Sequence, residues 1–519
     1  MELAAEYPPK YRFSWWALIW LGMAIGIFFR VHHLGEDSLW FDEGYTAWMV
    51  SHSPAEIVRL IGADTAPPLY YLLLHGWTDL FGRSETALRS LSAVFSIFTM
   101  LIANGIARRM LRKPAAVAAA TWAMGLSFLQ IWYAREARAY ALMGLLGVAA
   151  FDCLQRHLAE RRRRWLILLP LIFAAAMYTH NLMAPYLLAL LLAWLVLPSE
   201  HSMRRRIAEI SLAAGIAALL YLPWAVHGLP RQMRMIRQSF WMEPIKAGDF
   251  PAAIAALAGV RQFWSWTNLL DRMHIPTAGG ILPMGLLGCL LAGSAFASIF
   301  GQRGPRRREA IGLLTVAILP VVFVALCSVI WTPMFAEKLF LPSATLFPIF
   351  LLVPLGMGWP RAGLRIAWCG AMLLLLMVGL TLYGYDREIT KENWRGIAKI
   401  VSELPGGRRL IIFIANDGQL PFDYYYHYHY RAQDEATGVP ADFFDLDPPR
   451  TMRRVLDERD LNPLRARLAA GNYDQIVLVL AHEDWGDPQH LTRGLLRERW
   501  QRAGKTEIKD LAIEWYRKP

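Results

Sequence analysis

The sequence predicts a polytopic α-helical membrane protein of about eleven transmembrane helices, followed by a small α/β domain outside the membrane. Hydrophobic residues make up 55% of the 519 positions and charged residues only 18%. The apolar residues gather into runs near the ~20 residues that an α-helix needs to cross a bilayer. After Tyr383 these runs stop and charged residues become frequent. We therefore expect a transmembrane domain over residues 1–383 and a second domain over residues 384–519.

The predicted spans follow one another with short connections. In chain order they cover residues 15–29, 88–107, 114–132, 139–153, 165–178, 183–197, 207–226, 281–300, 311–331, 339–357 and 366–383. The first span leads straight into Arg30 without a small-residue cleavage site, so we expect a retained helix and not a cleaved signal peptide. All four cysteines fall in or at the end of spans, which suggests neither a disulfide framework nor a thiolate metal site.

Basic residues indicate the orientation of the chain. They crowd the alternate short loops near residues 108–113, 156–164, 204–206, 303–308 and 361–365. By the positive-inside bias these loops are cytoplasmic, so the long loops 31–87 and 227–280 and the C-terminal domain face outward. The net charge of +12 then follows mostly from topology, and we expect no nucleic-acid partner.

The C-terminal segment has the pattern of a small α/β unit. Short buried strands are expected at residues 409–415 and 473–480, amphipathic helices at 451–470 and 489–503, and a last strand at 507–517. A glycine-rich phosphate loop follows neither buried strand, so the sequence supports no nucleotide site there.

Two adjacent carboxylates, Asp42 and Glu43, follow the first span in Leu-Trp-Phe-Asp-Glu-Gly-Tyr. At the outer surface of a bilayer they could take a proton from a substrate that arrives in the membrane. The alternative is a surface loop whose carboxylates only stabilise the start of the next helix.

Three further outer segments carry polar residues. In residues 64–75, two prolines open a short apolar helix that carries Tyr70 and Tyr71 and is expected to lie at the interface. Arg135 and Arg138 lie three apart, against the positive-inside trend, and on one helical face they would suit a lipid phosphate; the alternative is that Glu136 and lipid headgroups satisfy them. Lys338 lies in a late outer turn, where a lysine commonly reaches to the interface.

The spans themselves contain few charges. Asp152, Glu209 and Arg89 all fall near predicted ends. Ionisable residues inside the membrane usually mark ion or proton pathways. An ion-coupled transporter is therefore disfavoured, and a lipid or glycan flippase, which also needs a polar path, is the weaker alternative to an enzyme.

Taken together, the outer segments resemble the membrane glycosyltransferases of the C-type fold that use polyprenyl-phosphate sugars. The likeness is to the bacterial family similar to protein O-mannosyltransferases and to the aminoarabinose transferase of lipid A. It spans residues 15–404 and rests on the acidic pair, Pro-Pro-Leu-Tyr-Tyr, Arg-x-x-Arg-x-Tyr, Tyr-Thr-His, the late outer turn and Lys-Glu-Asn-Trp-Arg at 391–395. Where many relatives have Arg-Tyr in the late turn, this chain has Glu-Lys-Leu-Phe at 337–340.

The resemblance implies an enzyme of the bacterial inner membrane whose site and C-terminal domain face the periplasm. It implies inverting transfer of a sugar from a polyprenyl phosphate to a lipid, glycan or protein hydroxyl, with Asp42 as base and Glu43 positioning the acceptor. Arg135, Arg138 and Lys338 would bind the donor phosphate, and Tyr70, Tyr71, Tyr140 and His180 would support the pocket. A divalent metal at the acidic pair stays open, and so do the sugar and the acceptor.

Overall fold

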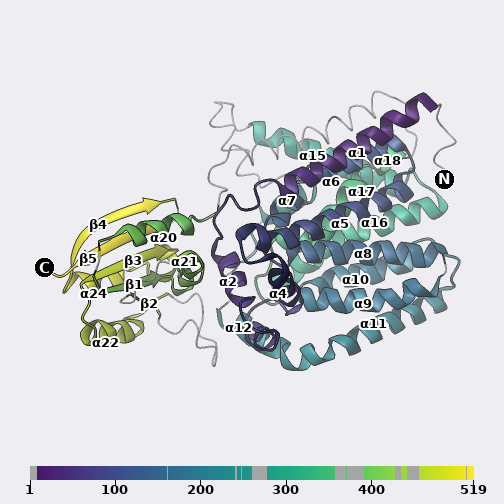
Figure 1. Ribbon diagram of the computed structural model, residues 1–519. Helices are drawn as coiled ribbons and strands as arrows, with labels where there is room; N and C mark the ends of the chain where they lie inside the picture. The colour runs from purple at the N-terminus through teal and green to yellow at the C-terminus, as the bar shows by residue number, and fades with distance from the viewer. Residues whose placement is uncertain are drawn as a thin grey trace.

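The computed structural model describes residues 9–160, 162–239, 242, 244–246, 248–259, 278–356, 370, 391–405, 407–426, 434–440, 455–509 and 511–519. Within these ranges, a bundle of long helices carries a separate sheet domain at one end (Figure 1). Helices α2, α4 and α12 lie at the end of the bundle that faces the sheet domain. The predicted eleventh span, residues 366–383, falls outside the described ranges except for Gly370.

Five helical segments of the described residues are long and apolar enough to cross a membrane. They are α1 (Pro9–Val31), α5 (Glu85–Leu111), α11 (Met203–His227), α16 (Gly304–Ile330) and the segment Glu337–Leu355. The bent pair α6 (Pro114–Gly125) and α7 (Phe128–Ala134) makes a sixth span if it is counted as one. The protein is thus a polytopic membrane protein, while the full set of about eleven spans stays a prediction.

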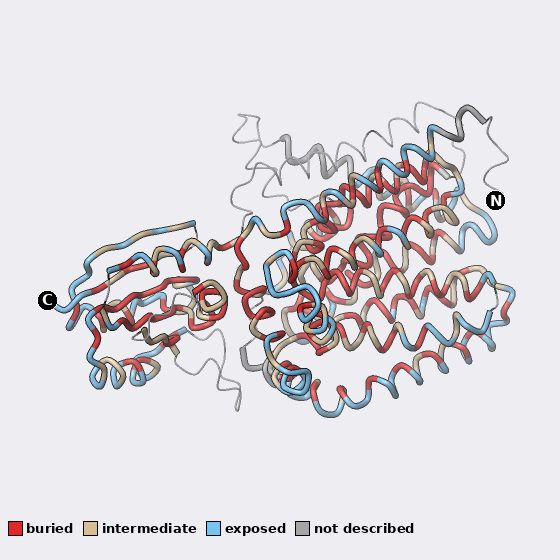
Figure 2. Tube along the Cα trace, in the orientation of Figure 1, coloured by how far each residue is buried: buried red, intermediate tan, exposed pale blue. Residues whose placement is uncertain are grey.

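Four further helices lie in other predicted spans of the described ranges. They are α8 (Tyr140–Glu160), α9 (Arg163–Thr179), α10 (Met183–Val196) and α15 (Ala278–Ile299). The late span begins with η3 (Glu337–Phe340) and continues as α17 (Leu341–Leu351) and α18 (Val353–Gly356). Buried residues run through the middle of the bundle, whereas α11 on its outside is largely exposed (Figure 2). Exposed leucines on α11, such as Leu219 and Leu222, suit a helix that faces lipid.

The predicted span over residues 114–132 is bent, because the helix breaks after Gly125 and α7 turns away by 48°. Arg30 of α1 occupies the break. Its buried guanidinium donates to the carbonyls of Met124 (3.0 Å) and Gly125 (3.0 Å). These carbonyls would otherwise end the helix without partners in an apolar setting, so Arg30 stabilises the bend.

The first outer loop folds into short helices over the end of the bundle. They are α2 (Phe41–Met49), α3 (Pro54–Leu60), η2 (Ile61–Ala63) and α4 (Leu69–Phe81). Ser53 and Glu56 form a capping box that starts α3. Tyr45, Tyr71 and Trp224 belong to the small apolar core that joins this layer to the bundle. The second outer loop contributes α12 (Leu229–Ser239) and α13 (Asp249–Leu257).

The C-terminal domain is a five-stranded sheet in the order β2-β1-β3-β5-β4. Strands β1 (Arg409–Ile414) and β3 (Gln475–Ala481) are buried along their whole length and pair in parallel, and β2 (Asp434–Gly438) is also parallel to β1. Strands β4 (Gln501–Ile508) and β5 (Leu511–Arg517) pair antiparallel. Strand β4 therefore replaces the end of the helix expected over 489–503. That helix is shorter, as α24 (Leu491–Arg497).

Helices cover both faces of the sheet. One apolar core joins α20 (Trp394–Glu403) and α21 (Gln419–Tyr426) to the sheet. The other core joins α22 (Asn462–Ala470) and α24 to the opposite face. Because α21 also packs against α2 of the first outer loop, the domain touches the segment that holds Asp42 and Glu43.

Candidate active site

A cavity of about 410 Å³ lies where the outer-loop helices meet the bundle. Its polar wall comes from segments far apart in the sequence, and it includes Asp42, Asp64, Arg138, Tyr140, His180 and Lys338. The rest of the wall is mainly apolar, with Met177, Leu182, Met233, Ile236, Trp331 and Leu339 among its members. A cavity lined by both charged and apolar side chains suits a ligand that has a charged head and a hydrocarbon tail.

Asp42 faces this cavity from the first turn of α2. The helix begins at Phe41, whose N–H donates to the carboxylate of Glu392 at 3.2 Å. The Asp42 carboxylate lies 3.8 Å from Nε of Arg138. That distance is longer than a hydrogen bond, so an incoming hydroxyl could approach the carboxylate.

Glu43, the next residue, points away from the cavity and is fully buried. Its two oxygens accept from Nε and Nη2 of Arg89 at 2.8 and 2.7 Å. Nζ of Lys391 lies 2.9 Å away and the N–H of Ala137 donates at 2.9 Å. Burial alone would raise the pKa of Glu43, but Lys391 and Arg89 outweigh it and lower the pKa to about 2. The acidic pair therefore does not converge on one point, as two ligands of one metal ion would.

The two arginines of the hairpin, Arg135 and Arg138, also lie in different surroundings. The expectation that they share a helical face is wrong, because α7 ends at Ala134 and α8 begins only at Tyr140. Arg138 is buried in the cavity wall and donates from Nη1 to the hydroxyl of Tyr71 at 2.9 Å. Arg135 instead donates to the carbonyl of His33 at 3.1 Å and lies outside the cavity lining.

Lys338 supplies the second cation of the cavity. It lies in η3, and its Nζ is 5.1 Å from the centre of the Tyr140 ring, within the range of a cation–π contact. His180 lies next to the same ring, at 6.3 Å between ring centres. Burial, helped by Lys338 and Arg138, lowers the pKa of His180 to about 3. The imidazole is therefore neutral near pH 7, and its Nδ1 accepts from the N–H of Leu182.

The two tyrosines of α4 stand behind the wall, in a supporting position. The Tyr71 hydroxyl donates to Asp64 at 3.1 Å while it accepts from Arg138. The Tyr70 hydroxyl bonds to Ser92 at 2.9 Å. Burial raises the pKa of both phenols above the usual range, so they act as neutral hydrogen-bonding groups.

Three charged residues at the site were not predicted from the sequence as site residues. Asp64 lines the cavity, and Arg89 and Lys391 hold Glu43. Arg89 looked like an ordinary charge at the end of a span, and Lys391 was only part of the family motif. An Asp three residues before a Pro-Pro helix start is the one local signal that could have marked Asp64.

A third buried carboxyl lies close to the pair. Glu136 is only 2% exposed, in the turn between α7 and α8. Burial raises its pKa to about 7, against the opposing effect of Lys391, and the negative charges of Glu43 and Asp42 add to the rise. This carboxyl therefore changes charge near neutral pH.

Known glycosyltransferases are similar to this chain in sequence. The family model described as dolichyl-phosphate-mannose-protein mannosyltransferase matches residues 65–227. The undecaprenyl phosphate-alpha-4-amino-4-deoxy-L-arabinose arabinosyl transferase of Pseudomonas paraeruginosa is 24% identical over 476 residues, which cover 76% of this chain and 81% of that protein.

Two solved structures share the fold. ArnT from Cupriavidus metallidurans in the apo state superposes with a TM-score of 0.51 at 14% identity and covers 96% of this chain and 97% of its own. The archaeal oligosaccharyltransferase AglB from Archaeoglobus fulgidus, in complex with an inhibitory peptide and a dolichol-phosphate, gives a TM-score of 0.50 at 11% identity. The match covers 99% of this chain and 75% of AglB. At these identities the likeness carries the fold alone.

Proposed function

We propose that this chain, a membrane glycosyltransferase of the C-type fold, transfers a sugar from a polyprenyl phosphate to a hydroxyl group of an extracytoplasmic lipid, glycan or protein. The proposal rests on one observation. The Asp42 carboxylate lies 3.8 Å from Nε of Arg138, in a cavity that Lys338 also lines. The cavity lining thus contains a possible base, Asp42, and two cations, Arg138 and Lys338. Sugar transfer from a phosphate needs both kinds of group.

In the proposed reaction, the acceptor hydroxyl lies against the Asp42 carboxylate. Its oxygen forms a bond to the anomeric carbon as the bond from that carbon to the phosphate oxygen breaks. The hydroxyl proton passes to Asp42, and the bonding electrons leave with the polyprenyl phosphate. Arg138 and Lys338 stabilise the charge that grows on the phosphate. A single displacement of this kind inverts the anomeric configuration.

Asp42 is favoured over Asp64 as the base because Asp64 already has close partners. The Asp64 carboxylate accepts from Tyr71, and also from the N–H of Thr65 at 2.6 Å. It therefore holds Tyr71, and through Tyr71 it orients Arg138. Glu43 is placed in the same supporting role, because its oxygens are occupied by Arg89 and Lys391.

The apolar wall supports a lipid-linked donor. Met177, Leu182 and Trp331 are among the apolar residues that line the cavity, and an isoprenoid chain could pack against them. The donors named for similar proteins carry their sugar on undecaprenyl phosphate or dolichyl phosphate, which are lipids of this chemistry. A flippase is disfavoured, because the cavity collects its charges at the outer ends of the helices and not along a path between them.

The donor set of the cavity does not favour a metal ion. Among the residues that the structure describes, the one grouping of three metal-ligating side chains lies elsewhere, at His157, His201 and Glu209. We therefore assign each step of the reaction to protein side chains.

We further propose that the protein lies in the bacterial inner membrane with the cavity facing the periplasm. Arginines gather at the opposite ends of the helices, for example Arg108, Arg109 and Arg205, which is the distribution expected of a cytoplasmic face. Mass spectrometry of envelope glycans from a strain that lacks the protein would name the sugar and the acceptor.

The decisive experiment compares two matched substitutions in the first outer loop. Asp42→Asn should fold like the parent and lower transfer from a polyprenyl-phosphate sugar by roughly 10² to 10⁴, as expected for loss of a general base. Asp37→Asn makes the same chemical change five residues earlier, outside the cavity lining, and should keep parental activity. Parental turnover by folded Asp42→Asn protein would remove Asp42 from the mechanism.

A further inference from the structure

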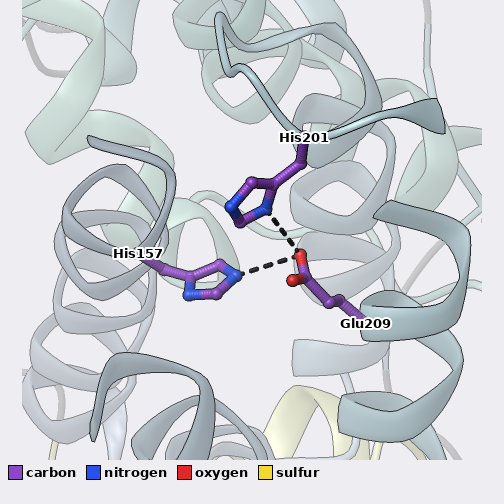
Figure 3. Close-up of side chains that lie close together, drawn as sticks. All are labelled: His157, His201 and Glu209. Carbon is purple, nitrogen blue, oxygen red and sulfur yellow. Dashed lines mark hydrogen bonds and ion pairs between the residues drawn. The ribbon is translucent and has the colours of Figure 1, made fainter. Parts of the chain in front are cut away.

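Three side chains that can bind a metal ion meet at the end of the bundle away from the cavity. His157 lies near the end of α8, His201 in the connection from α10 to α11, and Glu209 in the second turn of α11. The three side chains point toward one another from these separate elements (Figure 3). All three residues are less than 9% exposed.

The distances are close to those of a metal site. Oε2 of Glu209 lies 3.1 Å from Nε2 of His157 and 3.1 Å from Nδ1 of His201. All three ligand atoms lie within 4.8 Å of one another. In a tetrahedral zinc site with bonds of ~2.0–2.1 Å, neighbouring ligand atoms are ~3.3 Å apart. Small side-chain adjustments therefore suffice to place all three atoms around one ion.

The remaining atoms of the cluster are arranged as in a supported site. Oε1 of Glu209 accepts from Nε of Arg205 at 2.9 Å, which leaves Oε2 for the histidines. The second ring nitrogens, Nδ1 of His157 and Nε2 of His201, are buried without a hydrogen-bond partner among the described residues. If the cluster were held by hydrogen bonds alone, each neutral ring would donate its one N–H to the same oxygen of Glu209. The other ring nitrogens, Nδ1 of His157 and Nε2 of His201, would then be buried acceptors without a donor.

We propose that His157, His201 and Glu209 bind one divalent transition-metal ion of the Zn²⁺ type. Two imidazoles and one carboxylate favour such ions over Mg²⁺ and Ca²⁺, which prefer oxygen ligands alone. Glu209 coordinates through Oε2, and a water or a second carboxylate contact completes the shell. The site is separate from the sugar-transfer cavity and does not depend on the proposed reaction.

The ion stabilises the inner ends of helices whose outer ends form the cavity. Helix α8 begins at Tyr140 and helix α11 carries Tyr221, and both residues line the cavity. His157 is 17 residues along α8 from Tyr140, which corresponds to ~25 Å of helix. A metal bridge between α8 and α11 therefore restricts how these helices move apart, without touching substrate.

The test uses the full chain, purified in detergent with an affinity tag that contains no histidine and stripped with a chelator. After Zn²⁺ is added back, we expect the parent to retain one ion per chain through desalting and to melt several degrees higher than the stripped protein. Added Co²⁺ should produce the visible absorption bands of a four- or five-coordinate site. His157→Ala and Glu209→Gln should bind Zn²⁺ more than roughly 100-fold more weakly.

Two further variants separate a metal site from a hydrogen-bonded cluster. His201→Gln keeps an N–H donor for Glu209 but should lose Zn²⁺, whereas His201→Cys should keep it through a thiolate. His33→Ala removes a half-exposed histidine near the outer surface and should bind like the parent. Absence of stoichiometric Zn²⁺ and of cobalt bands in the parent, or equal retention by His157→Ala, would overturn the proposal.

Discussion

The carboxylate of Glu43 forms a two-pronged ion pair with the guanidinium of Arg89, at 2.8 and 2.7 Å, and neither side chain reaches solvent. The same carboxylate accepts from the N–H of Ala137 and meets Lys391. One side chain thus joins α2, α5, the turn before α8 and the start of the C-terminal domain. Because Asp42 precedes Glu43 on α2, these contacts also set the direction of the Asp42 carboxylate.

We predict that Glu43→Gln destabilises the protein. Gln keeps the shape but leaves the charges of Arg89 and Lys391 buried without a counter-charge, and breaking a buried pair costs about 3–5 kcal/mol. The melting temperature and the folded yield in detergent should fall sharply. Asp42→Asn should change neither the melting temperature nor the folded yield. If Glu43→Gln melts like the parent and loses only turnover, Glu43 acts in catalysis after all.

The second prediction concerns the hairpin arginines. Arg138→Ala should raise KM for the donor and lower kcat together, by roughly 10² to 10³ in kcat/KM, because a fixed cation stabilises the departing phosphate most strongly. Lys should restore only part of the activity, since it lacks the forked contact.

Arg135→Ala is the matched control for Arg138→Ala. Its guanidinium contacts the carbonyl of His33 outside the cavity, so kcat/KM should stay within a few-fold of the parent. Steady-state kinetics with a polyprenyl-phosphate sugar measure both variants. Equal losses from the two would mean that the phosphate reaches beyond the cavity described above.

The third prediction tests the contact between the C-terminal domain and α2. A Cβ atom on Gly44 would lie 2.6 Å from Cα of Pro421, too close for α21 to keep its place. Gly44→Ala should therefore lower the melting temperature and slow transfer. Gly76→Ala makes the same change in α4, where a Cβ would meet no atom within 4 Å.

Because alanine is the better helix former, Gly76→Ala should stabilise the protein slightly, by about 0.5–1 kcal/mol. Differential scanning fluorimetry gives the melting temperatures. A Gly44→Ala protein as stable and active as Gly76→Ala would show that the close approach of Pro421 has no consequence for function.

The fourth prediction is a pH dependence set by Glu136. Its pKa is raised from 4.5 to about 7, so the folded protein binds more protons than the unfolded chain between these values. Stability should therefore fall as pH rises from 4.5 to 7 and then level off, with a loss of about 3 kcal/mol.

Glu136→Gln removes this titration. The variant should be more stable than the parent above pH 7, and the difference should vanish below pH 4.5. Melting temperatures of both proteins from pH 4 to 9 provide the measurement. A difference that does not change with pH would mean that Glu136 stays ionised throughout.

Five of the site residues named from the sequence line the cavity. They are Asp42, Arg138, Lys338, Tyr140 and His180. Glu43 and Arg135 do not, for a geometric reason. Successive residues on an α-helix point ~100° apart, so neighbours such as Asp42 and Glu43 face different surroundings. The helical spacing expected for Arg135 and Arg138 failed because the chain makes a turn there.

The sequence by itself determined that the chain is a polytopic membrane protein, because hydrophobic run length is a local property that one segment carries alone. The orientation inferred from loop charge stays a prediction. The tertiary structure alone decided which charges meet. Arg89 and Lys391 reach Glu43 from segments distant in the chain, and His157, His201 and Glu209 converge in the same way. Such encounters depend on how the helices pack and rotate against one another, and no single segment encodes that packing.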